Sequence, residues 1–190
     1  MHSAHRIVSS ESEDLILVDA DDKETGFLSK AKAHHGQGIL HRAFSVFLFN
    51  EKGELLLQQR AASKRLWPGF WSNSCCSHPR RGETMPVATR RRLLDELNID
   101  AELEYVYKFI YRAEFGEFGS EYELCHVYLG RVDGDVHAND HEIESTRFLS
   151  AAELESEFDG ESGNFTPWFE MEWQSLKTNY DDYLRRYLAD

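Results

Sequence analysis

Residues 44–49, with the sequence Phe-Ser-Val-Phe-Leu-Phe, constrain the fold of this chain more than any other segment. So dense a run of aromatic and aliphatic residues is typical of a core strand. Residues 50–53 contain asparagine and glycine and predict a turn, and apolar residues return at 55–57 within a second strand, 55–59. Two such strands joined by a short turn predict a β-hairpin at the centre of a sheet.

The remaining segments predict a sheet with helices on both sides. Further strands are expected at residues 15–18, 103–115 and 121–129. Helices are expected at residues 86–97, 151–158 and from 166 to the C-terminus, where aromatic and leucine residues recur at helical spacing. The apolar stripe of the first helix is expected to be Val87, Leu93, Leu94 and Leu97. Together these elements predict an α/β (α+β) fold, a mixed β-sheet sandwiched between helices.

The composition fits one globular domain in a reducing compartment. The chain has 190 residues, of which 41% are hydrophobic, and we expect a flexible N-terminal tail at residues 1–13 before a single domain at 14–190. No apolar run is long enough to span a bilayer, and the first residues do not resemble a signal peptide. Three cysteines, two of them adjacent, make a poor disulfide framework. A cytoplasmic protein without a membrane partner is therefore expected.

The chain is strongly acidic. Its net charge is −13, from 34 acidic and 21 basic residues, which argues against binding of nucleic acid through the phosphate backbone. Few lysines among many acids resemble the surface of proteins from a salt-rich cytoplasm, and ordinary solubility is the other interpretation. The salt hypothesis predicts that stability rises in molar KCl, and a melting temperature that stays flat would rule it out.

Residues 73–79, Asn-Ser-Cys-Cys-Ser-His-Pro, are the most informative segment for function. Adjacent thiols beside a histidine are compatible with redox chemistry, metal binding or proton transfer by a thiol. A cationic, tryptophan-containing segment precedes them at residues 64–71, and a helix with arginines and acids follows. A thiol between such neighbours indicates an active site.

Histidines and carboxylates supply a second group. His34 and His41 flank the first core strand, His78 follows the thiols, and Glu121 and Glu123 alternate along a strand and so point to the same face. Three histidines and two carboxylates suit a divalent metal such as Zn²⁺, Mn²⁺ or Mg²⁺. Taken singly, each histidine is more often a surface or core residue than a ligand.

The helix at residues 86–97 carries part of a known signature. Glu83, then seven residues, then Arg91 and the pair Asp95-Glu96 resemble the motif of Nudix proteins. In Nudix hydrolases the acids of this motif hold Mg²⁺ on a diphosphate. Arg92 stands where those enzymes have a glutamate, which argues against a hydrolase.

Taken together, the motifs resemble the type 1 isopentenyl-diphosphate delta-isomerases, a Nudix-fold family. The resemblance runs from about Leu15 to the terminal helix and rests most on the Cys-Ser-His-Pro segment and the Trp-Pro-Gly segment before it; it is also carried by residues 60–64, 111–113, 121–123 and 166–168. It implies a Nudix-like fold and an isomerase that interconverts isopentenyl and dimethylallyl diphosphate, in isoprenoid biosynthesis. The partner is then a small isoprenoid diphosphate, and a monomer is the simplest expectation.

The resemblance also implies residue roles. Glu123 and Cys76 are the two proton-transfer groups, and Trp168 forms the wall that faces the cationic intermediate. We assign Glu123, helped by Tyr111, to donate the first proton and Cys76, as a thiolate, to accept the second; the opposite direction stays open because the reaction is reversible. One divalent cation (Mn²⁺, Mg²⁺ or Zn²⁺) is implied at His34, His41, His78, Glu121 and Glu123. Mg²⁺ is implied at Glu96 together with the diphosphate, whose own contacts are Lys30, Arg60, Lys64 and Arg92.

The strands at 103–115 and 121–129 allow an independent prediction. If their turn is centred on Glu117, Tyr111 faces Glu123 and Ala113 faces Glu121, so that the phenol can hydrogen-bond the carboxyl. Two other functions stay open at this point. A Nudix diphosphate hydrolase would release phosphate, and a non-catalytic Nudix-like module would bind ligands without turnover.

Overall fold

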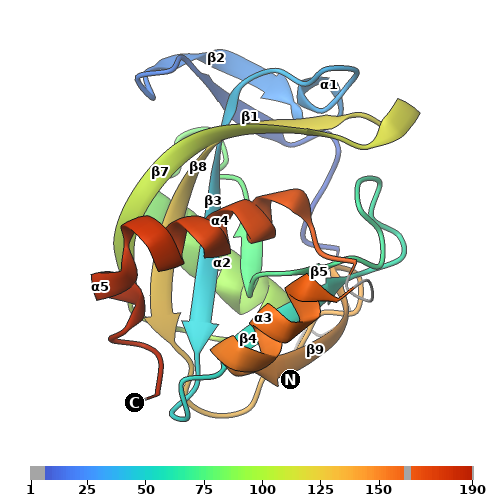
Figure 1. Cartoon of the computed structure of the whole chain (residues 1–190). Helices are drawn as coiled ribbons and strands as arrows, with labels where there is room; N and C mark the ends of the chain where they lie inside the picture. The colour runs from blue at the N-terminus through green and yellow to red at the C-terminus, as the bar shows by residue number, and fades with distance from the viewer. Residues whose placement is uncertain (1–6, 161–163, 190) are drawn as a thin grey trace.

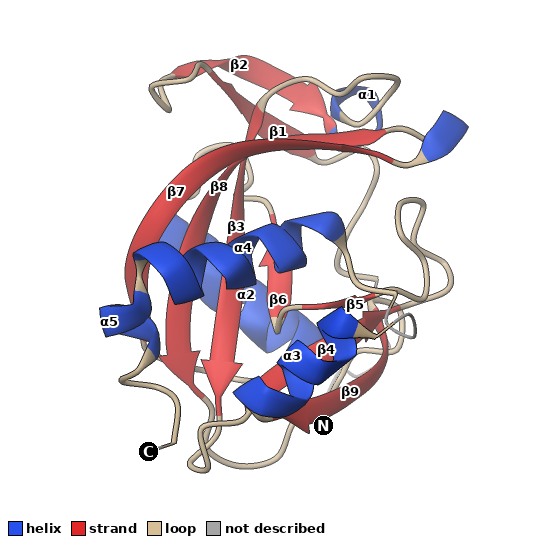
Figure 2. Ribbon diagram, in the orientation of Figure 1, coloured by secondary structure: helices blue, strands red, loops and turns tan. Residues whose placement is uncertain are grey.

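A mixed β-sheet with helices on both faces forms the core of the computed structural model, which describes residues 7–160 and 164–189 (Figures 1 and 2). The strands are β1 Asp14–Val18, β2 Glu24–Ser29, β3 His41–Phe49, β4 Leu55–Arg60, β5 Trp71–Ser72, β6 Cys75–Ser77, β7 Leu103–Glu114, β8 Ser120–Arg131 and β9 Ile143–Leu149. The helices are α1 Lys30–Ala33, α2 Met85–Leu97, α3 Ala151–Asp159, α4 Pro167–Asn179 and α5 Asp181–Leu184. A single 3₁₀ turn, Gly116–Phe118, joins β7 to β8.

Strand β3 is the central strand of the sheet. It pairs in parallel with β8 from His41↔Glu123 to Phe49↔Arg131, and β8 pairs antiparallel with β7. On its other edge β3 pairs antiparallel with β6, from Phe44↔Ser77 to Val46↔Cys75. The thiol segment is therefore a strand, and it lies across β3 from the strand that carries Glu123.

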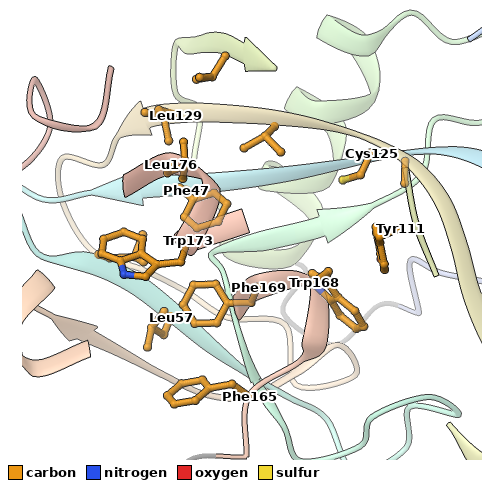
Figure 3. Close-up of a cluster of buried hydrophobic side chains, with 14 of the residues drawn as sticks. Phe47, Leu57, Tyr111, Cys125, Leu129, Phe165, Trp168, Phe169, Trp173 and Leu176 are labelled. Carbon is orange, nitrogen blue, oxygen red and sulfur yellow. The ribbon is translucent and has the colours of Figure 1, made fainter. Parts of the chain in front are cut away.

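The two faces of β3 bury different clusters. Phe44, Val46 and Leu48 point to the side where α2 packs, together with Leu93 and Leu97 of that helix. Phe47 and Phe49 point to the opposite side, where α4 contributes Trp168, Phe169 and Trp173 (Figure 3). Figure 1 shows α4 in front of the sheet and α2 behind it. The predicted architecture, a mixed sheet between helices, is confirmed.

The predicted hairpin at the centre is present but almost unpaired. Strands β3 and β4 share the single pair Phe49↔Leu55. β4 separates from β3 because it pairs with β9 along Leu55↔Leu149 to Arg60↔Ile143, while β6 takes the free edge of β3. Strands β2 and β9 were not expected, since their residues are only partly buried and show little apolar alternation.

The expected single C-terminal helix is interrupted. α4 ends at Asn179, Tyr180 has φ −132°, and α5 begins at Asp181. The ring of Tyr180 stacks on Tyr107 of β7, with centroids 4.3 Å apart and planes at 5°. The helix is thus interrupted at the residue whose ring packs on the sheet. The helical spacing of the apolar residues did not predict this interruption.

The predicted stripe of α2 was wrong at two positions. Val87 and Leu94 are 55% and 39% exposed, although Leu93 and Leu97 are buried as expected. The buried face instead includes Ala88 and two charged residues, Arg92 and Glu96, each 3% exposed. The helix is rotated so that an arginine and a glutamate face the protein interior.

The expected tail at residues 1–13 lies outside the described residues for its first six positions. Its described part packs against the domain, because Val8 is buried and its carbonyl accepts a hydrogen bond from Arg92 Nη1 at 2.9 Å. Ser9 Oγ accepts a hydrogen bond from Lys30 Nζ at 2.7 Å. None of the helices in the described part of the chain combines the length and apolar character needed to cross a membrane.

Candidate active site and metal centre

The structure brings the five predicted metal ligands together. His34 follows α1, His41 opens β3, His78 follows β6, and both glutamates come from β8, which pairs with β3 so that Glu123 lies beside His41. One ligand atom from each residue lies within 4.8 Å of all the others. The cluster consists of His34, His41, His78, Glu121 and Glu123.

Backbone carbonyls orient two of the histidines. Nδ1 of His34 donates to the Lys30 carbonyl at 2.8 Å, and Nδ1 of His41 donates to the Ile39 carbonyl at 2.7 Å. These bonds occupy Nδ1 of each ring, so that Nε2 is the nitrogen directed to the cluster.

Buried polar atoms in the cluster lack partners within the described chain. Nε2 of His34 and of His41 and Oε2 of Glu121 have no hydrogen bond, although Nε2 of His34 lies 2.6 Å from that oxygen. Buried polar atoms are rarely left in this state. Convergent imidazole nitrogens and carboxylate oxygens without hydrogen-bond partners fit a divalent cation.

Both oxygens of Glu123 are engaged. Tyr111 donates to Oε2 at 2.6 Å, while Oε1 lies 2.8 Å from Nε2 of His78 and 3.5 Å from Nε2 of His41. The predicted register is confirmed, because Tyr111 pairs with Glu123 and Ala113 with Glu121. Burial alone would raise the pKa of Glu123, but His41 and Tyr111 lower it below its usual value.

The adjacent thiols point to opposite faces of the sheet. Cys75 is fully buried against α2, and its thiol lies 3.6 Å from Glu96 Oε1. Cys76 lines the same pocket as Glu123 and Tyr111, with Arg60 Nη1 3.9 Å from its sulfur. Burial raises the pKa of Cys76 to about 11, so the thiol holds its proton at neutral pH.

Trp168 forms a wall of this pocket. Its Nε1 donates to Ser72 Oγ at 3.1 Å, and its ring meets Trp67 edge to face with centroids 5.1 Å apart. The guanidinium carbon of Arg60 lies 5.3 Å from the Trp168 ring centre. Ser72, which no sequence motif singled out, also lies 3.9 Å from the Cys76 sulfur and so touches both the indole and the thiol.

The pocket also contains several cationic side chains. All the residues expected to contact a diphosphate line it, namely Lys30, Arg60, Lys64 and Arg92. Burial, together with the charges of Lys64 and Arg92, lowers the pKa of Lys30 to about 8. Crowded cations of this kind are typical of an anion site.

Two acids of the Nudix-like signature have protein partners. Glu96 accepts a hydrogen bond from Arg92 Nε at 2.7 Å and stands outside the group of clustered ligands. Glu83 accepts two hydrogen bonds from Arg91, at 2.7 and 2.8 Å. Glu142, which sequence reasoning missed, accepts hydrogen bonds from both Lys64 and Arg92. With 34 acidic residues in the chain, nothing in the sequence distinguished it.

Comparisons with known proteins identify the family of the chain. Residues 39–169 match the NUDIX domain family. Isopentenyl-diphosphate Delta-isomerase 1 of Photorhabdus laumondii is 40% identical over 174 residues, covering 90% of this chain and 99% of that relative. The chain belongs to the isopentenyl-diphosphate Delta-isomerases. The Burkholderia multivorans member of this family is 45% identical over 157 residues, which cover 83% of this chain and 89% of that relative.

Among solved structures, the Deinococcus radiodurans protein DR0079 superposes with a TM-score of 0.68 at 23% identity, covering 84% of this chain and 96% of that chain. A MutT protein of Methanosarcina mazei gives a TM-score of 0.55 at 20% identity, covering 78% of this chain and 92% of that chain. These similarities concern the fold alone. This chain thus has a Nudix fold. Its Cys76, Glu123 and Trp168 line one pocket.

Proposed function

We propose that this protein interconverts isopentenyl diphosphate and dimethylallyl diphosphate, with Cys76 and Glu123 as its two proton-transfer groups. The observation that carries the proposal is the pocket itself, in which a thiol, a carboxylate held by Tyr111, a tryptophan wall and several cationic side chains occur together. Members of the family with 40% and 45% identity are named for this reaction.

The reaction adds a proton to the terminal alkene carbon and removes one from the carbon nearest the diphosphate-bearing carbon. One group must therefore carry a proton and the other must be able to accept one. Burial keeps the Cys76 thiol protonated, while the pKa of Glu123 is lowered. These charge states favour Cys76 as the first donor and Glu123 as the acceptor, which is the opposite of the direction assigned from the sequence. The same pair serves the reverse reaction with the roles exchanged.

A carbocation-like centre forms between the two proton transfers. Trp168 presents an aromatic face to this position, and its indole is held by the hydrogen bond to Ser72 and by contact with Trp67. Trp168 is 2% exposed, so this residue is shielded from solvent. Exclusion of water protects the cation from capture as an alcohol.

The His and Glu cluster fits a divalent cation, with His34, His41, His78, Glu121 and Glu123 as its ligands. When bound, such a cation holds the Glu123 carboxyl in place and changes its proton affinity. Mn²⁺, Mg²⁺ or Zn²⁺ suits this donor set. For the diphosphate we propose contacts with Lys30, Arg60, Lys64 and Arg92, and Mg²⁺ shared with Glu96 once Arg92 turns to the substrate.

One assay tests the function against the hydrolase alternative. Purified protein is incubated with Mg²⁺ and isopentenyl diphosphate, and dimethylallyl diphosphate and free phosphate are both measured. The allylic isomer without phosphate is the expected result. Phosphate without the isomer would identify a hydrolase, and no product would leave a binding module.

A further inference from the structure

Glu142 occupies a constrained position beside the cationic side chains of the pocket. Its side chain is 3% exposed, in the loop that leads into β9. Its carbonyl accepts a hydrogen bond from the Ala61 amide at 3.0 Å, and its own amide donates to the Asn139 carbonyl at 2.9 Å. Pairing of Arg60 with Ile143 brings this loop against β4. A carboxylate buried this firmly requires charged partners.

Those partners are two cations expected to bind the diphosphate. Lys64 Nζ and Arg92 Nη2 both donate to the same oxygen, Oε2 of Glu142, the second at 3.3 Å. Lys64 and Arg92 both line the pocket. Together they hold the pKa of Glu142 below its usual value in spite of burial. Glu142 thus occupies hydrogen-bond donors that an anionic ligand would use.

The other cations of this subsite have neutral partners. Lys30 donates to the Ser9 hydroxyl at 2.7 Å, and Arg60 donates to the carbonyls of Leu66 and Trp67 at 2.9 and 3.1 Å. Hydrogen bonds between charged groups are about twice as strong as those between neutral groups. For Lys64, Glu142 is therefore the partner that competes most directly with a diphosphate, whereas Arg92 is also held by Glu96, which accepts from its Nε at 2.7 Å.

We propose that Glu142 is an exchangeable counter-ion, whose carboxylate positions Lys64 and Arg92 in the free protein and releases them when a diphosphate binds. This inference rests on the proposed function in one respect: it takes a diphosphate as the ligand of Lys64 and Arg92. In the free protein the carboxylate offsets the repulsion among Lys30, Lys64 and Arg92. Its displacement weakens diphosphate binding, and the product leaves more easily for the same reason.

The test is binding of inorganic pyrophosphate to Glu142→Gln by titration calorimetry, with the purified metal-containing protein and no added Mg²⁺. Glutamine keeps the shape of the side chain and removes its charge. Pyrophosphate should therefore bind about tenfold more tightly, which corresponds to the lower end of the coupling energies of close charge pairs. Glu144→Gln is the matched control, since it makes the same change in net charge at an exposed position of β9. It should change the affinity by less than about twofold.

A merely structural role predicts the opposite sign. Equal or weaker pyrophosphate binding by a folded Glu142→Gln would overturn the inference, since the carboxylate would then be a fixed support. If that variant does not fold, Glu142→Asp retains the charge but shortens the reach to Lys64, and it should also bind pyrophosphate more tightly than the wild type. Unchanged or weaker binding by Glu142→Asp would equally refute exchange. Isomerisation by the wild type tests the function separately, because pyrophosphate binding needs no turnover.

Discussion

Tyr111→Phe removes one hydroxyl from the centre of the site and leaves the ring in place. In the wild type this hydroxyl is buried and donates to Oε2 of Glu123 at 2.6 Å. The other oxygen of Glu123 keeps its contact with His78 at 2.8 Å, so the carboxyl loses one of its two anchors. No residue of the metal cluster is altered.

The cost can be worked from that single bond. A hydrogen bond to a charged group contributes about 1.5–3 kcal/mol, which corresponds to about 10- to 100-fold in rate if the bond acts in the transition state. The protonation state of Glu123 changes during the reaction, whereas the contacts with the diphosphate stay the same. We therefore expect kcat to fall by about 10- to 100-fold with KM nearly unchanged. The unpaired carboxylate oxygen should also lower the melting temperature by several degrees.

The assay is the conversion of isopentenyl diphosphate followed by proton NMR, with bound metal measured in the same preparation. Tyr105→Phe is the matched control, because Tyr105 lies on the same strand and is 46% exposed. It should keep wild-type kcat. If Tyr111→Phe keeps kcat within about twofold while its melting temperature falls, the phenol is a structural support and its role in proton transfer is refuted.

Three further predictions concern the site, and a fourth concerns Glu172, a fully buried glutamate of α4. Cys76→Ala should abolish turnover, whereas Cys75→Ala should keep most of it, because Cys75 faces α2 and not the pocket. Equal losses in the two variants would contradict the different roles assigned to the two thiols. His41→Ala should lower bound divalent metal by elemental analysis, and wild-type metal content would count against the cluster. Because the Cys76 thiol has a pKa of about 11 and holds its proton, kcat at saturating substrate should stay level from about pH 7 to pH 9; a rise of about tenfold per pH unit would make the thiolate the reactive form. Burial raises the pKa of Glu172 from 4.5 to about 8, so the unfolded chain loses this proton first and wild-type stability falls as pH rises between those values. Glu172→Gln should therefore raise the melting temperature at about pH 8 more than at about pH 5, and an equal gain at both would refute this cause.

Much of the fold was predictable because its signals are local. The apolar run that became β3 and the register that pairs Tyr111 with Glu123 follow from side-chain alternation and turn position. The rotation of α2 was not predictable in the same way. Arg92 and Glu96 are polar by type but buried as an ion pair, so a hydrophobic pattern assigns them to the wrong face.

The chemical inventory of the site came from the sequence, and its geometry did not. The histidines, the two glutamates and the thiols could be named from residue type and spacing, since ligand chemistry depends on side chains alone. Strand β6, which carries Cys76, is separated from β8 by β3 alone. This arrangement depends on the pairing of β6 with β3, a contact between backbones that carries little side-chain signature.

By itself, then, the sequence determined the reactive groups and the family resemblance, whereas the strand β6, which sends Cys75 and Cys76 to opposite faces, was found only in the structure. Only the tertiary structure decided the neighbours of the cationic residues. Glu142 reaches Lys64 and Arg92 because β4 pairs with β9, which brings together segments far apart in the chain. Long-range strand pairing selects such neighbours through backbone hydrogen bonds and burial, and no local pattern of residues encodes them.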